Sequence, residues 1–258
     1  MVDGPSDARR AVEARLAEAP PALRLFFERE LEKARLALAE GASVEHLAAT
    51  LRAICERVAK LLETSLDARA IACRRGCSWC CRGLRVEVLA PEALTIARHL
   101  RSARQPAELS ALLPALATQA ELARQLSPQQ LWQAQTPCIF LDQASGACSI
   151  YEARPIVCRL HHSLDRAKCE RAASDQDATI PRHAASEDLY GLAQAALLLS
   201  CEERGLDARS LELASALQIA LGALDVGERW ADGERVFETA AFRPRDEPWP
   251  SEDFDEHG

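Results

Sequence analysis

Apolar residues recur at helical spacing along both flanks of this chain. Residues 43–66 give the clearest example, because their apolar positions fall on one stripe at the three- and four-residue intervals of an α-helix. Ser43 precedes that stripe, where its side chain can cap the first turn. The stripe consists of Val44, Leu47, Leu51, Ile54, Val58, Leu61 and Leu62. Similar patterns predict helices over residues 8–18, 21–40, 91–101, 108–126, 187–203 and 210–226.

Strand signals are few. Residues 84–89 alternate between apolar and polar side chains, and residues 138–141 are able to pair with residues 148–151 across the turn 142–146. The predicted fold is therefore mainly α, an essentially all-α framework with a loop-and-hairpin region that bears a cluster of cysteines.

This pattern divides the chain into four regions. They are residues 1–70, the N-terminal helices; residues 71–186, a cysteine-cluster metal-binding region; residues 187–226, a C-terminal helix pair that packs on the core; and residues 227–258, an acidic and partly mobile tail. The tail is rich in acids and contains Pro244, Pro248 and Pro250, so we expect its end to be mobile.

Charge and hydropathy restrict the classes of partner. The 258 residues carry a formal net charge of −8 with a pI near 5.4, which argues against nucleic acid as a partner. Residues 1–30 are charged throughout and lack the apolar run of a signal peptide. The longest apolar run, residues 193–199, is far shorter than the about 20 residues of a membrane span. We therefore expect a cytoplasmic protein without membrane contact, and an unknown protein partner stays open.

Eight of the ten cysteines lie in the stretch with the least helical periodicity. They begin with a tight C-x3-C-x2-C-C run and continue at nearly even spacing: Cys73, Cys77, Cys80, Cys81, Cys138, Cys148, Cys158 and Cys169. Clustering brings no packing advantage to a free cysteine, which behaves as a small hydrophobe in a core. The other two, Cys55 and Cys201, lie on predicted helices and are assigned to packing.

Metal binding explains this cluster better than disulfides do. Thiolate is the soft ligand that proteins use for zinc and for iron–sulfur clusters, and thiols stay reduced in the cytosol. The alternative is a strained disulfide between Cys80 and Cys81 under oxidation. Arginines beside the cysteines would offset thiolate charge; they are Arg74, Arg75, Arg82, Arg85, Arg154 and Arg159. Gly76 and Gly146 are expected to provide turns, and Pro155 a helix start that directs Cys158 to the site.

The cysteine-rich stretch resembles a known family. The points of resemblance are the C-x3-C-x2-C-C run with Gly76, the C-x-F-L-D segment at residues 138–142, and the G-x-C-S-I-Y-x-x-R-P-x-x-C-R block at residues 146–159. Together with Cys169 in C-E-R-A, they resemble the YkgJ-type (CxxCxxCC) cysteine cluster family, a zinc- or iron-chelating domain, over residues 71–173. Many members begin with C-x2-C, so the x3 spacing here implies a slightly different ligand loop. The resemblance implies a metal site built from the eight cysteines.

The spacing of the cysteines favours an iron–sulfur cluster narrowly over zinc. A zinc ribbon offers two C-x2-C knuckles, whereas this chain has one, Cys77-x2-Cys80, and its remaining cysteines are scattered. The adjacent side chains of Cys80 and Cys81 diverge, so they would ligate different irons or two separate centres. A compact run with distant cysteines is a common construction of iron–sulfur sites. The number of centres stays open.

Three functional classes are compatible with this site, and whether the protein is an enzyme stays open. The first is a metal-binding module with a redox, metal-handling or structural role. The second is a metal-dependent enzyme, such as the iron–sulfur protein lysine methylases of the resembled family. The third is a helical interaction protein stapled by structural zinc. The C-x3-C-x2-C run also matches radical S-adenosylmethionine enzymes, but Cys81 and the absence of strand–helix repeats disfavour that interpretation.

Two histidines follow the seventh cysteine of the cluster. His161 and His162 lie three and four residues after Cys158, close enough in sequence to complete a metal shell. With eight cysteines available, a supporting or surface role is favoured. No side chain is assigned a catalytic role, because the sequence contains no defensible nucleophile arrangement.

Overall fold

The computed structural model describes residues 6–39, 43–64, 70–175 and 178–242. This part of the chain is mainly helical, as predicted. Its helices are α1 (Asp7–Glu18), α2 (Pro21–Ala37), α3 (Val44–Glu63), α4 (Ala90–Ala103), α5 (Pro106–Gln125), α6 (Pro128–Ala134), α7 (Ile156–Leu160), α8 (Arg166–Ala172), α9 (Ala184–Glu203), α10 (Leu213–Gly222) and α11 (Val226–Ala231). Short 3-10 turns are η2 (Trp79–Cys81), η3 (Tyr151–Ala153) and η4 (Glu238–Ala240), and strand β1 (Glu87–Val88) pairs antiparallel with β2 (Leu211–Glu212).

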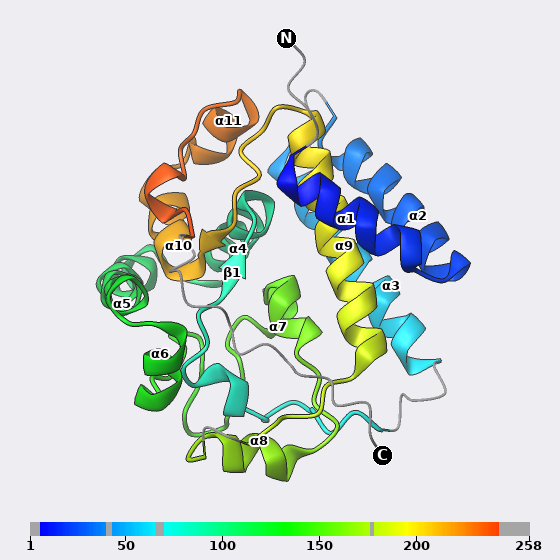
Figure 1. Ribbon diagram of the computed structural model, residues 1–258. Helices are drawn as coiled ribbons and strands as arrows, with labels where there is room; N and C mark the ends of the chain where they lie inside the picture. Colours follow the sequence, from blue (N-terminus) through cyan, green and yellow to red (C-terminus); the bar gives the residue numbers. More distant parts are fainter. Residues whose placement is uncertain (1–5, 40–42, 65–69, 176–177, 243–258) are drawn as a thin grey trace.

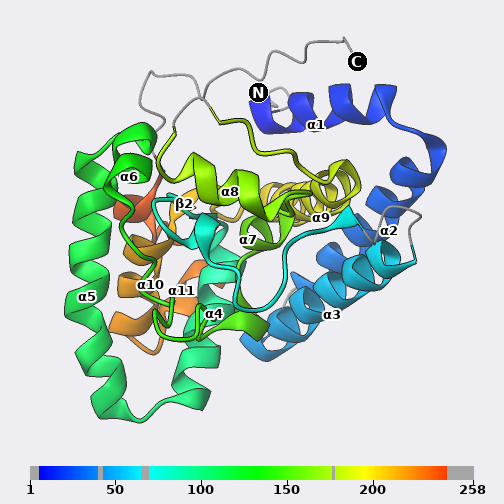
Figure 2. The same cartoon turned by 90° about the horizontal axis from the view of Figure 1, so that it is seen from below.

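Two groups of helices flank the segments that bear the cysteines (Figures 1 and 2). Helices α1, α2, α3 and α9 form one group, in which α9 packs against the other three. Helices α4, α5, α10 and α11 form the other, in which α10 packs against the other three. Contact between α3 and α4 joins the groups, while α7 lies between them and packs on α9. The cysteine-bearing segments are therefore held on a helical framework.

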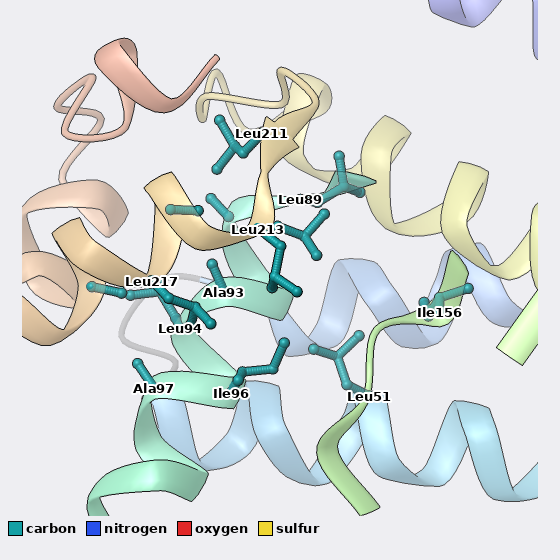
Figure 3. Packing of buried hydrophobic residues seen from close by; sticks show 14 of the residues in the cluster. Leu51, Leu89, Ala93, Leu94, Ile96, Ala97, Ile156, Leu211, Leu213 and Leu217 are labelled. Atoms are coloured by element: carbon teal, nitrogen blue, oxygen red, sulfur yellow. The ribbon is translucent and has the colours of Figure 1, made fainter. Parts of the chain in front are cut away.

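The core forms where α3, α4 and α10 meet (Figure 3). Ile54, Ile96 and Leu217 are at most 1% exposed there. The stripe predicted for α3 is buried except at its edges: Leu61 is 47% exposed because it lies at the solvent side of the helix. The predicted cap is confirmed, since the Ser43 hydroxyl accepts a hydrogen bond from the His46 N–H at 3.2 Å.

Some predicted boundaries were wrong, and three short helices were missed. The helix predicted to run to residue 40 ends at Ala37. The helix predicted over residues 210–226 is shorter at both ends, because β2 pairs with β1 first and α10 begins only after β2. At the C-terminal end of α10, the Arg101 guanidinium donates to the carbonyls of Ala220 and Ala223 at 2.7 and 2.8 Å. The missed helices, α6, α8 and α11, are too short for apolar periodicity. Two of them have a side-chain cap, Ser127 at α6 and Asp165 at α8.

The first part of the predicted acidic tail is packed on the core. Trp230 is 3% exposed and Phe237 is fully buried, and the Phe242 N–H donates to the Ser210 carbonyl at 2.7 Å. The rest of the predicted tail, residues 243–258, lies outside the described residues. Among the helices that are described, none combines the length and apolar character that crossing a bilayer requires.

A buried carboxylate ties the framework to the cysteine region. Glu92, in the first turn of α4, accepts hydrogen bonds from the N–H groups of Leu89 (2.9 Å) and Ile156 (2.8 Å). Burial raises its pKa, an effect that these two N–H groups partly offset. Ile156 begins α7, the helix that carries Cys158, so Glu92 fixes the position of one candidate ligand.

Replacement of Glu92 by glutamine should lower the free energy of unfolding by about 1–3 kcal/mol, because the amide nitrogen cannot accept from a backbone N–H and one buried donor loses its partner. Urea unfolding measures the change. Glu108→Gln is the matched control, since Glu108 occupies the same position in an exposed turn of α5 and accepts one N–H, from Gln105 at 2.7 Å. Equal effects of the two replacements would contradict the assigned role of the Ile156 contact.

Candidate metal centre

The first four cysteines lie on one loop that ends in η2. At its start, the Ala72 N–H donates to the Ser163 carbonyl at 2.8 Å, which fixes Cys73 beside the segment that leads into α8. At its end, the N–H of Cys81 donates to the Ser78 carbonyl at 3.0 Å in the η2 turn. Between Leu62 and Val88 no described residue contributes a buried hydrophobic side chain. Backbone hydrogen bonds and polar contacts, and not a hydrophobic core, therefore hold this loop.

Two glycines allow this loop to approach the hairpin that follows. Gly76 and Gly146 both have positive φ, +86° and +68°. A Cβ on Gly146 would lie 2.6 Å from the Gly76 carbonyl oxygen, closer than real contacts allow. Both glycines therefore form the turns predicted for them, and their close contact joins two segments that are far apart in the sequence.

The predicted hairpin is present, but it is shorter than predicted. Leu141 and Cys148 form one antiparallel bridge, and the Ser149 N–H donates to the Phe140 carbonyl at 2.7 Å. The turn is closed by Asp142, whose carboxylate accepts from the Ser145 N–H at 2.8 Å. This arrangement brings Cys138 and Cys148 to neighbouring positions at the base of the hairpin.

Three of the sulfur atoms gather around Ser163. The Ser163 N–H donates to the Cys73 Sγ at 3.2 Å. Burial raises the pKa of Cys169, an effect that the neighbouring Ser163 partly offsets. Cys73 also hydrogen-bonds Cys77, which raises the pKa of Cys73 and lowers that of Cys77 to about 6. Repulsion by the Cys77 and Cys169 thiolates further raises the pKa of Cys73. Cys73, Cys77 and Cys169 thus form one set of interacting thiols.

Four other thiols form a second set, around Cys81. The Cys138 N–H donates to the Cys81 carbonyl at 2.7 Å. Burial raises the pKa of Cys138 to about 12, and the Cys81 and Cys148 thiolates add to that increase. Burial also raises the pKa of Cys158, with further contributions from the thiolates of Cys138, Cys81 and Cys148. Cys81, Cys138, Cys148 and Cys158 are therefore mutual neighbours.

Cys80 lies between the two sets. Its thiol hydrogen-bonds Cys81, which lowers the pKa of Cys81 to about 7. Its electrostatic neighbours also include Cys158 of the second set and Cys73 of the first. The vicinal pair is therefore the bridge between the sets.

The donor set matches the chemistry of a thiolate metal centre. The pKa is raised for six of its thiols and lowered for Cys77 and Cys81. All ten cysteines are free. Within the described residues, no three His, Cys, Asp or Glu side chains are arranged to hold an ion as they stand. Hydrogen bonds between thiols, such as Cys73 with Cys77, require protons that ligation would displace. Metal binding at these sulfurs would thus release protons and draw each set inward.

Arginine side chains supply compensating positive charge. Arg154 is a charge neighbour of Cys81, Cys148 and Cys158, and its guanidinium lies 4.3 Å from the centre of the Tyr151 ring. Arg74 and Arg166 are charge neighbours of Cys77. Sequence reasoning missed Arg166, which reaches the site only because α8 folds back onto η2. Conversely, Arg85 is directed elsewhere, to the carbonyls of Ala123 and Leu126 and the ring of Phe242.

The two histidines and the remaining cysteines have other surroundings. Burial lowers the pKa of His161 and of His162 to about 4, so both imidazoles are neutral. His162 Nδ1 hydrogen-bonds the Ser186 hydroxyl at 2.9 Å, an interaction that supports α9. Cys55 and Cys201 belong to the hydrophobic core, in agreement with their assignment to packing.

Comparison with known proteins identifies the class of this region. A family model described as "CxxCxxCC: Putative zinc- or iron-chelating domain" matches residues 72–179, a segment that contains all eight clustered cysteines. No curated protein and no solved structure matches the chain. The resemblance expected from the sequence is thereby confirmed: the middle of this mainly helical protein matches the model of a CxxCxxCC domain, a type described as chelating zinc or iron.

Proposed function

We propose that this protein holds two metal centres, each bound by four thiolates, and that iron–sulfur clusters fill them in preference to zinc. One observation supports the proposal: the eight cysteines come from separate loops, turns and helices, and each has other clustered cysteines among its electrostatic neighbours. The first centre is proposed to use Cys73, Cys77, Cys80 and Cys169. The second is proposed to use Cys81, Cys138, Cys148 and Cys158.

The assignment of Cys80 follows from the geometry of η2. Successive side chains in a 3-10 turn point about 120° apart, because the turn has three residues. Cys80 and Cys81 therefore serve different centres once they become ligands. Cys80 has charge neighbours in both sets, Cys158 and Cys73. The set around Cys81 already contains four thiols, whereas the set around Ser163 contains three. Cys80 accordingly completes the first centre.

The arrangement of the ligands favours iron–sulfur clusters, whereas charge fits either metal. Four thiolates leave a net negative charge around zinc and around a cluster core alike, and each centre here has arginine neighbours, Arg154 at the second and Arg74 and Arg166 at the first. A compact run combined with distant cysteines is a common construction of cluster sites. The proposed role is redox, metal-handling or structural in a reducing cytoplasm, where free thiols persist.

Metal analysis of protein purified without oxygen tests the proposal. We expect brown protein whose visible absorption bleaches with dithionite, and iron and acid-labile sulfide in comparable amounts. Colourless protein with two zinc ions per chain and no sulfide would reject iron–sulfur clusters and retain the two thiolate centres. Protein that takes up neither metal after anaerobic reconstitution would reject the proposed function altogether.

A further inference from the structure

A small cavity of about 80 Å³ lies between α3, α4 and the segment from η3 to α7. Its wall includes Leu51 and Ile156, two of the core residues seen in Figure 3. Four arginines line it, from three different parts of the chain: Arg52, Arg98, Arg154 and Arg159. Such a concentration of guanidinium groups around a small cavity is an arrangement that recognises anions.

The carboxylates near this cavity offset only part of the arginine charge. Glu92 and Glu152 line it, but both oxygens of Glu92 already accept backbone N–H groups. Arg98 pairs with the exposed Glu45 at 3.1 Å. Arg52, on α3, has no hydrogen-bond or ion-pair partner among the residues that the structure describes. The cavity therefore retains unpaired positive charge.

Two buried polar atoms at the cavity also have no partner. The hydroxyl oxygen of Thr95 and the Nε of Arg154 are shielded from solvent and form no hydrogen bond within the described part of the chain. Both residues line the cavity. Buried donors almost always have acceptors in folded proteins, so a ligand with several acceptor oxygens would satisfy both groups.

We propose that this cavity binds a small oxyanion of the size of phosphate. Its small volume, about 80 Å³, suits a small ion. The oxyanion would accept from the Thr95 hydroxyl, the Arg154 guanidinium and the Arg52 guanidinium. Phosphate-type oxygens match the two-pronged donor geometry of arginine.

The cavity adjoins the second set of thiols. Arg154 and Arg159 are charge neighbours of Cys55, which lines the cavity, and equally of Cys148. The bound anion would therefore share arginines with the proposed second metal centre. If the arginines only balanced thiolate charge, Arg52 on α3 and Thr95 on α4 would have no role. Neither of these two helices carries any of the eight clustered cysteines.

Titration of the full, metal-loaded chain with inorganic phosphate tests this inference, by calorimetry and by the ³¹P linewidth. We expect saturable binding with a Kd below about 1 mM. Arg52→Gln and Thr95→Val should each weaken it by about tenfold, through loss of a guanidinium contact and of a hydroxyl donor. Arg29→Gln is the matched control, because Arg29 is an exposed arginine on α2, away from the cavity, and should bind as the natural chain does.

Absence of saturable phosphate binding would overturn the inference. Binding that both variants retain at full strength would overturn it as well, because it would place the anion elsewhere. Metal and sulfide are measured on the same samples, so the fate of the thiolate centres is determined independently of phosphate binding.

Discussion

Removal of metal is expected to release the loop of the first four cysteines while the helical flanks stay folded. Residues 70–81 contribute no buried hydrophobic side chain, so without ligation only backbone hydrogen bonds and polar contacts would hold them in place. A structural zinc contributes on the order of 10–16 kcal/mol in small peptides, comparable to the stability of a whole domain. Helices α3, α4 and α10 form a core that contains none of the eight clustered cysteines and should remain.

Limited trypsin digestion before and after stripping with a chelator measures this effect. Cleavage after Arg74, Arg75 and Arg82 should accelerate by at least about a hundredfold, because local opening exposes the loop. Arg57, in the middle of α3, is the internal control and should stay protected. The helical circular dichroism signal should change little. A cleavage pattern in the loop that metal removal leaves unchanged would contradict a stabilising role for the metal.

Single serine replacements are expected to remove one centre at a time. Cys77 belongs to the set around Ser163 and Cys138 to the set around Cys81, and a hydroxyl is a poor replacement for a thiolate ligand. Cys77→Ser and Cys138→Ser should therefore each lower the metal content to about half, and the double variant should bind almost none. Cys80→Ser should behave as Cys77→Ser does, although its neighbour Cys81 belongs to the other centre.

Metal and sulfide content per chain, with the visible spectrum, provides the measurement. Cys201→Ser is the control, because Cys201 is fully buried in the core on α9 and should leave metal content unchanged. If the replacement of any one clustered cysteine abolishes all metal binding, the eight thiolates hold a single centre, and the assignment to two centres is wrong.

Residue spacing alone predicted the long helices and the main features of the domain. The stripe from Val44 to Leu62 predicted α3 because burial of one helical face requires side chains every three or four residues. Gly76, Gly146 and the turn after Leu141 were also visible in the sequence, since positive φ and tight turns favour particular residue types. The family match over residues 72–179 likewise depends on motifs that are local in sequence.

Only the tertiary structure decided which cysteines are neighbours. Cys169 meets Cys73 because both lie beside Ser163, and Cys138 meets Cys81 through a backbone hydrogen bond although 56 residues lie between them in the sequence. The same holds for the arginine-lined cavity, whose walls come from three segments. Local propensities act over a few residues, so they determine elements and turns. The meeting of distant side chains depends on how those elements pack, and this determines the candidate metal centres and the anion cavity.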